Sequence, residues 1–134
     1  MKNQQLPNFQ ALCCLLDTNV VIGLLKAQVA SMDLLKASNS QLSELAVSQI
    51  TRLELLGFAG ISPKEAQAIQ SFLANIQVLP ISGKVEVETI ALRQSAKIKL
   101  PDAIIAGTAL AHGLKLLTLD EPLKRVYQAM VTEQ

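Results

Sequence analysis

Short runs of apolar residues alternate along this chain with longer segments in which apolar residues recur every three or four positions. The first run, residues 12–16, is continuously apolar, which is typical of a strand buried on both faces of a parallel sheet. Three later runs have the same character and predict strands at residues 46–48, 78–81 and 114–118. Strands that alternate with helical segments indicate parallel pairing through right-handed crossovers.

The helical segments between these runs have recognisable ends. Ser62 and Glu65 form a capping box, and Pro63 falls at the first helical position. Pro101 and Gly113 bracket an alanine-rich helix in the same manner. Further helices are predicted to begin near positions 20, 49 and 121, and we expect the last of them to be short.

The segment 83–98 also predicts a helix, and its apolar spacing assigns an inward face to Val87, Ile90, Ala91 and Ile98. Half of the 134 residues are apolar, which suits one core. We therefore expect a single three-layer α/β domain over the whole chain, with a central parallel sheet of four to five strands flanked by helices. The polar residues 1–10 are expected to form a loose N-terminal segment.

Composition and charge exclude several classes of protein. A charged fraction of 17% excludes a disordered chain, and a net charge of +1 excludes binding of nucleic acid through bulk positive charge. No stretch is long and apolar enough for a membrane span, and we see no signal peptide. Cys13 and Cys14 are adjacent, so in a strand they point to opposite faces, and we expect reduced thiols in a cytoplasmic protein.

Three of the four aspartates lie where expected strands end or where the following helices begin. Asp17 follows the first strand, Asp102 lies in the first turn of the alanine-rich helix, and Asp120 follows the last strand. Glu54 lies about two turns into the helix after the second strand. Because ligands bind at the carboxyl ends of strands in open parallel sheets, we expect the four acids to converge on one crevice.

Each acid also has a local explanation that the sequence leaves open. Asp17 is a good helix cap, and Glu54 can pair with Thr51 in a capping box. Asp102 is favoured by the dipole at a helix start, and Asp120 belongs to a good turn sequence. Capping alone, however, gives no reason for the four acids to gather at the same end of one sheet.

Acids that do gather need a partner for their charge. Two carboxylates about 4 Å apart repel by roughly 4 kcal/mol at an effective dielectric of about 20. Such a cluster must hold protons or a cation, and oxygen ligands suit Mg²⁺ or Mn²⁺, which keep several waters and accept phosphate oxygens. The arrangement fits hydrolysis of a phosphodiester, because it can activate a water and stabilise the leaving oxygen.

Four segments of the chain resemble the motifs of PIN domains. They are residues 15–22 (LLDTNVVI), 48–56 (SQITRLELL), 100–106 (LPDAIIA) and 117–120 (LTLD). Their order and spacing extend over residues 12–125, nearly the whole chain. The sequence is most similar to the toxin component of VapBC-type toxin–antitoxin pairs, which are small cytoplasmic ribonucleases.

This resemblance implies a Mg²⁺- or Mn²⁺-dependent endoribonuclease that cleaves RNA, often a structured RNA such as tRNA. It also implies a small antitoxin whose C-terminal segment lies in or near the acidic crevice, and commonly a homodimer. By position, the main metal-site acids are Asp17, Glu54 and Asp102, and Asp120 is the fourth, directly or through water.

The same positional comparison assigns two supporting residues. Asn19 is expected to orient Asp17, and Thr118 to hydrogen-bond a neighbouring carboxylate. His112, the single histidine, is expected to be solvated or bonded to a carbonyl near a helix end. Five basic residues offer either a foothold for RNA phosphates or a scatter of solvated charges: Arg52, Lys97, Lys99, Lys124 and Arg125.

The sequence leaves two rival functions open. A receiver-type phosphoacceptor domain also contains clustered aspartates, but it needs adjacent acids after the first strand and a lysine after the last, and the chain has neither. A PIN fold that binds a protein partner or RNA without cleaving it is the second, although all four acids are retained.

Overall fold

The computed structural model describes residues 11–133, and the segment expected to be loose, residues 1–10, lies outside this part. The described chain forms a four-stranded parallel sheet in the order β3-β2-β1-β4. Its strands overlap the predicted runs: β1 Cys14–Leu16, β2 Leu45–Ser48, β3 Gln77–Leu79 and β4 Lys115–Leu117. The parallel α/β sheet predicted from the apolar runs is therefore confirmed.

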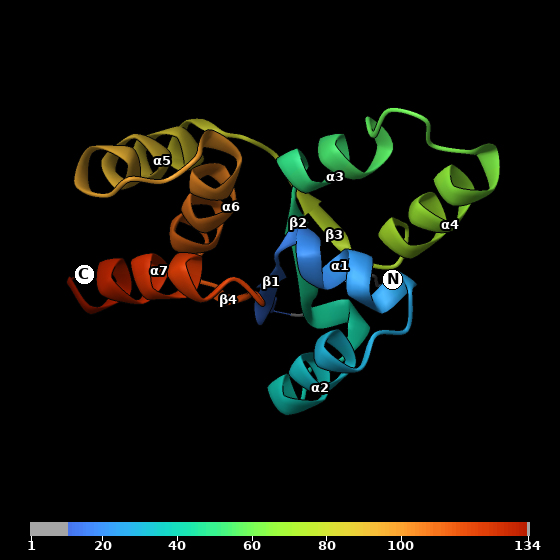
Figure 1. Cartoon of the computed structure of the whole chain (residues 1–134). Helices are drawn as coiled ribbons and strands as arrows, with labels where there is room; N and C mark the ends of the chain where they lie inside the picture. Colours follow the sequence, from blue (N-terminus) through green and yellow to red (C-terminus); the bar gives the residue numbers. More distant parts are fainter. Residues whose placement is uncertain (1–10, 134) are drawn as a thin grey trace, which may run out of the picture.

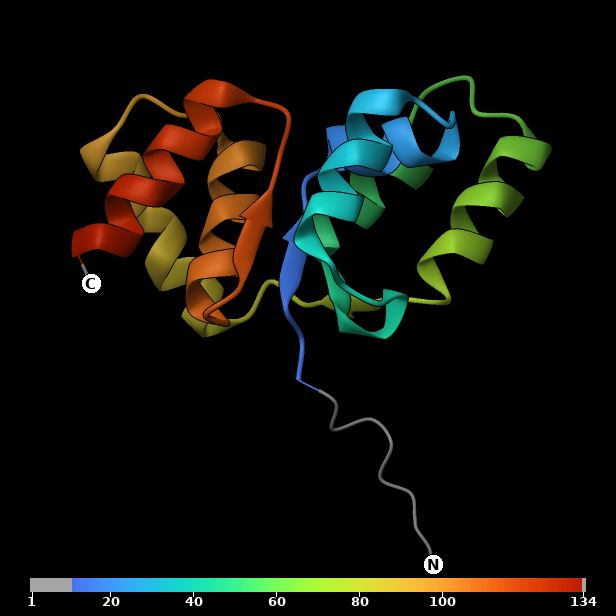
Figure 2. The same cartoon turned by 90° about the horizontal axis from the view of Figure 1, so that it is seen from below.

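Helices cover both faces of this sheet and give the expected three layers. They are α1 Thr18–Leu25, α2 Val29–Ser38, α3 Gln49–Leu56, α4 Pro63–Leu73, α5 Gly83–Ser95, α6 Leu100–Ala111 and α7 Glu121–Glu133. In Figure 1, α5, α6 and α7 lie on the left of the sheet and α1 to α4 on the right; Figure 2 shows the same division from below. None of these helices has the length and apolarity that a membrane crossing requires.

The central strand β1 supplies both cores because its side chains alternate between the two faces. Leu15 packs into the cluster beneath α5, α6 and α7, together with Leu92 and Ile105. Cys14 and Leu16 point the other way, into the cluster covered by α1 to α4. All three residues of the strand are fully buried, as the continuous apolar run predicts.

The predicted inward face of the helix over segment 83–98 is wrong for Val87 and Ile90, which are 65% and 50% exposed. Ala91 is only partly buried, and Ile98, which packs against the core as expected, lies beyond the end of the helix at Ser95. The buried residues of α5 are instead Val85, Thr89 and Leu92.

Contact with α6 explains this face of α5. A Cβ added at Gly107 of α6 would lie 2.5 Å from Thr89 Oγ1, so the two helices approach closely at this point. The Thr89 hydroxyl is satisfied locally, because it donates to the Val85 carbonyl at 2.7 Å. A polar residue can therefore occupy the inner face, which an apolar count does not detect. Helix α7 also runs to Glu133 and is not short.

Candidate functional site

A pocket of about 650 Å³ is lined by all four predicted acids. Asp17 follows β1, Glu54 lies on α3, Asp102 lies in the first turn of α6, and Asp120 immediately precedes α7. Because the strands are parallel, β1 and β4 deliver their following residues to the same edge of the sheet. The convergence that the sequence suggests is therefore present in the structure.

Asp17 is buried and held at both carboxylate oxygens. Its Oδ1 accepts the backbone N–H of Thr18 at 2.7 Å, which makes it the cap of α1. Its Oδ2 accepts the hydroxyl of Thr118 at 2.6 Å, from the segment after β4. Asp17 thus caps a helix and also lines the pocket, and the expected hydrogen bond from Thr118 to a carboxylate is present.

The segment from Thr118 to α7 carries Asp120 in a tight set of hydrogen bonds. The Asp120 N–H donates to Thr118 Oγ1 at 3.0 Å, and Asp120 Oδ1 accepts the Leu123 N–H at 3.1 Å. Asn19 acts on this segment as well, since its Oδ1 accepts the Leu119 N–H at 3.4 Å. The structure therefore gives Asn19 a contact other than the predicted one with Asp17: it holds the backbone next to Asp120.

Glu54 is an exposed residue in the second turn of α3. Its Oε1 accepts the Thr18 hydroxyl at 2.7 Å, which ties α3 to the start of α1. The capping box with Thr51 is absent, because α3 begins at Gln49 and is capped by Ser48. Thr51 is instead fully buried, and its hydroxyl lies 2.9 Å from Thr18 Oγ1.

Burial and mutual repulsion disfavour ionisation of two of the acids. Burial raises the pKa of Asp17 above its ordinary value, and the charges of Asp102 and Asp120 raise it further, against the hydrogen bonds that stabilise its carboxylate. The pKa of Asp102 is also raised, first by burial and then by Asp120 and Glu54, while Lys99 opposes the shift. The carboxyl groups that line the pocket are thus close enough for their negative charges to repel one another.

Comparison with known proteins identifies the fold. The family model of the PIN domain matches residues 14–129. This chain belongs to the PIN domain family. None of the curated proteins compared matches its sequence.

Solved structures resemble this PIN domain over most of its length. A chain of a toxin–antitoxin complex from Klebsiella pneumoniae is 34% identical with a TM-score of 0.69, over 80% of this chain and 86% of that one. A chain of FitAcB from Neisseria gonorrhoeae is 28% identical with a TM-score of 0.67, over 86% of this chain and 93% of that one. A chain of DNA-bound VapBC from Salmonella typhimurium is 25% identical with a TM-score of 0.65, over 77% of this chain and 83% of that one.

The donor set of the pocket fits a hard divalent cation, because its potential ligands are carboxylate oxygens. Among residues 11–133, no three acidic, histidine or cysteine side chains are close enough to form a ready-made coordination shell. Mg²⁺ and Mn²⁺ usually take one or two carboxylates and keep waters in their other positions. Asp17 and Asp102 are the best placed of the four, because burial makes their charge the most costly to leave uncompensated.

Sequence reasoning missed the other half of the pocket. Beyond the acids, its wall is largely apolar and is built by α1, by the loop between α3 and α4, and by the middle of α4: Ile22, Leu25, Phe58, Ile61, Ala68 and Ile69. Phe58 is 64% exposed, so the pocket leaves an aromatic side chain accessible. Periodicity predicts which residues face away from solvent, but it cannot reveal a gap between helices.

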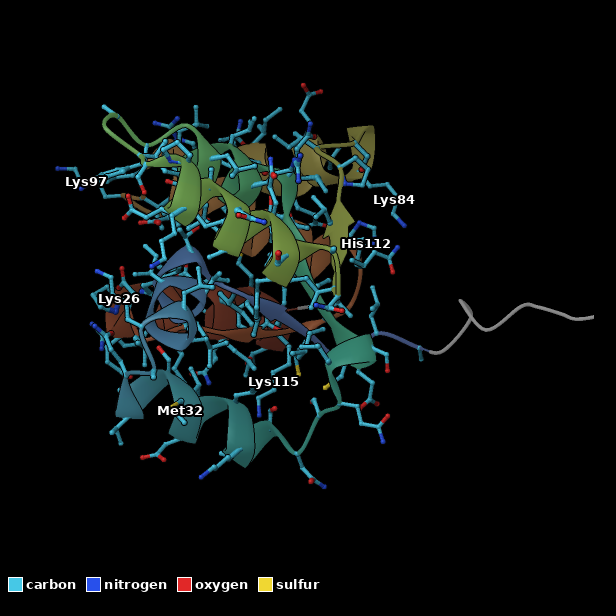
Figure 3. All side chains as sticks on the ribbon, turned by 90° about the vertical axis from the view of Figure 1, so that its right-hand side faces the viewer. Lys26, Met32, Lys84, Lys97, His112 and Lys115 are labelled. Carbon is cyan, nitrogen blue, oxygen red and sulfur yellow. The ribbon has the colours of Figure 1, made fainter. Side chains whose placement is uncertain are left out.

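Lys26 and His112 lie toward opposite ends of the molecule in the view of Figure 3. Lys26 lines the pocket, and Figure 3 shows Lys97 at the same end. His112 and Lys84 lie at the opposite end. Burial and the nearby Lys84 lower the pKa of His112, which ends α6. The single histidine is therefore remote from the pocket.

Proposed function

We propose that this PIN domain is a Mg²⁺- or Mn²⁺-dependent endoribonuclease and the toxin of a type II toxin–antitoxin pair. One observation carries the proposal: four carboxylates from four separate chain segments line one pocket at the edge where β1 and β4 end. Local capping explains the bonds of Asp17 and Asp120, but it gives no reason for Glu54 and Asp102 to join them.

The four acids have different roles as metal ligands, and the roles follow from how firmly each carboxylate is held. When bound, Mg²⁺ or Mn²⁺ supplies an activated water and stabilises charge on the leaving oxygen. Asp17 is the fixed ligand, because Thr18 and Thr118 hold both of its oxygens. Asp102, which also lines the pocket, is the second ligand, and Glu54 and Asp120 complete the site directly or through water.

The proposed substrate is RNA, including structured RNA such as tRNA. A polyanion approaching four carboxylates needs positive charge beside them. Lys26 on the pocket wall, Lys97 at the same end, and Lys99 next to Asp102 provide it. The net charge of +1 then poses no obstacle, because these three lysines supply local positive charge beside the acids.

The proposed protein partner is a small antitoxin, in keeping with the toxin–antitoxin complexes among the structural neighbours. The pocket offers an apolar wall beside an acidic end, which matches an antitoxin segment with apolar side chains next to an arginine or lysine. Such a segment neutralises the carboxylates and blocks access of RNA. We further propose that the toxin forms a homodimer.

The test is an RNA cleavage assay on the purified protein with Mg²⁺ or Mn²⁺, with EDTA, and with the variant Asp102→Asn. We expect cleavage that requires the metal and is lost in the variant. Cleavage that persists in EDTA, or in well-folded Asp102→Asn, contradicts the proposal. A folded, metal-binding wild type that binds RNA but leaves it intact points instead to a PIN fold that acts only as a binding module.

A further inference from the structure

Thr18 contacts two of the four acids through two different groups. Its backbone N–H donates to Asp17 Oδ1 at 2.7 Å, and its hydroxyl donates to Glu54 Oε1 at 2.7 Å. We propose that Thr18 is the positioning residue for Glu54 and that buried Thr51 supports it. This inference rests on the proposed nuclease function and adds to it a residue that the motif comparison left without a role.

The direction of the hydrogen bonds follows from counting protons. A hydroxyl has one proton to donate, and Thr18 gives its proton to Glu54. The 2.9 Å contact between the hydroxyls of Thr18 and Thr51 must therefore be donated by Thr51. The chain of bonds runs from Thr51 to Thr18 to Glu54, and each bond polarises the next.

Burial makes the start of this chain rigid. Thr51 is fully buried, so its hydroxyl needs a partner inside the protein, and Thr18 provides it. Glu54 itself is exposed on α3, and glutamate has a large rotamer freedom. The bond from Thr18 holds Oε1 toward the start of α1 and leaves Oε2 available to the pocket.

Substitution of Thr18 can separate its two roles. Thr18→Val keeps the shape of the side chain and the N–H that binds Asp17, but it removes the proton given to Glu54. Thr18→Ser restores that proton. Thr132→Val is a matched control, because Thr132 is an exposed threonine on α7 whose hydroxyl bonds to the Gln128 carbonyl, and it does not line the pocket.

The experiment measures the Mn²⁺ dissociation constant by electron paramagnetic resonance and RNA cleavage under single-turnover conditions. We expect Thr18→Val to weaken Mn²⁺ binding and slow cleavage by about tenfold, the lower end of the effect of outer-shell residues. Thr18→Ser is expected to recover most of both, Thr51→Val to show a smaller loss than Thr18→Val, and Thr132→Val to match the wild type.

A double-mutant cycle decides whether Thr18 acts through Glu54. In a Glu54→Ala background, Thr18→Val should weaken Mn²⁺ binding no further. An additional loss as large as in the wild type, or unchanged Mn²⁺ affinity in Thr18→Val itself, overturns the inference. A wild type that binds Mn²⁺ but cleaves no RNA defeats only the proposed function, because the Mn²⁺ cycle still tests the role of Thr18. A wild type that does neither defeats both.

Discussion

The two helical layers of this PIN domain use their apolar residues differently. On one side of the sheet, α5 and α6 pack so closely that Gly107 meets Thr89, and small residues such as Ala103 and Ala106 are fully buried. On the other side, α1, α3 and α4 leave between them the pocket of about 650 Å³, with Phe58 largely exposed at its wall. The first layer is closed and the second is open.

The closed layer provides stability and the open layer provides a surface for binding, within one small domain. The closed layer holds Asp102 and Asp120 on a well-packed support, at the starts of α6 and α7. The open layer carries Asp17 and Glu54 and leaves apolar surface uncovered beside them. The site lies where the two layers meet, so its acids are brought together by tertiary structure and are kept there against their own repulsion.

The largest expected effect is on activity, from removal of the acid that is held most firmly. Asp17→Asn should reduce metal-dependent RNA cleavage on the order of 10³-fold, beyond the range of about 10- to 100-fold typical of outer-shell residues. Asp33→Asn is the matched control, because Asp33 is an exposed aspartate on α2 outside the pocket. Equal activity of the two variants in single-turnover assays would remove Asp17 from the site.

The next effect is on stability and tests whether the closed layer is tightly packed. Gly107→Ala should lower the free energy of unfolding by about 1–3 kcal/mol, as overpacking does. The added Cβ would meet Thr89 Oγ1 at 2.5 Å and the Thr89 backbone N at 3.1 Å, so the backbone of α5 must move.

Gly83→Ala is its control in urea unfolding. No atom lies within 4 Å of a Cβ added there, and the change should stay within about 0.5 kcal/mol. Similar free energies of unfolding of the two variants would mean that α5 and α6 accommodate an added Cβ as easily as an exposed position does.

A smaller effect on stability is expected from Asp102, in the pocket where the two layers meet. In EDTA at neutral pH, Asp102→Asn should raise the melting temperature by about 3–5 °C, the shift that roughly 1 kcal/mol produces in a domain of this size. The cause is relief of burial and of repulsion from Asp120 and Glu54. Differential scanning calorimetry provides the measurement.

The pH dependence of this gain follows from the sign of the pKa shift. Because the pKa of Asp102 is raised in the native state, its carboxyl takes up a proton at a higher pH in the native protein than in the unfolded chain. The advantage of the variant is therefore present at neutral pH, shrinks as pH falls through the raised pKa, and vanishes below the ordinary value of 3.8. An unchanged or lower melting temperature at neutral pH contradicts the crowding of carboxylates.

The smallest effect is expected from the open layer. Phe58→Ser should change the free energy of unfolding by no more than about 0.5 kcal/mol, because the ring is mostly in solvent in the native state. Chemical denaturation measures this. A loss of about 2 kcal/mol or more would show that the ring belongs to the core, and the contrast between the two layers would fail.

Much of the fold could be predicted, because a strand buried on both faces needs a continuous apolar run, and β1 has one. The meeting of Asp17 and Asp120 could be predicted as well, since parallel strands deliver the residues after them to one edge, whereas Glu54 and Asp102 are brought to that edge by α3 and by α6, which follows a helix and not a strand. The inner face of α5 could not, because it depends on the contact of Thr89 with Gly107 in another helix. The apolar wall and the bond from Thr18 to Glu54 likewise arise only from tertiary packing.

In the proposed site, acids from both layers hold one divalent cation. Crystals soaked in Mn²⁺ and measured at a wavelength where manganese scatters anomalously test it most directly. We expect an anomalous peak in the pocket, bound by Asp17 and Asp102 with water in other positions. An empty pocket at saturating Mn²⁺, or a peak bound only by residues outside the four acids, would contradict it.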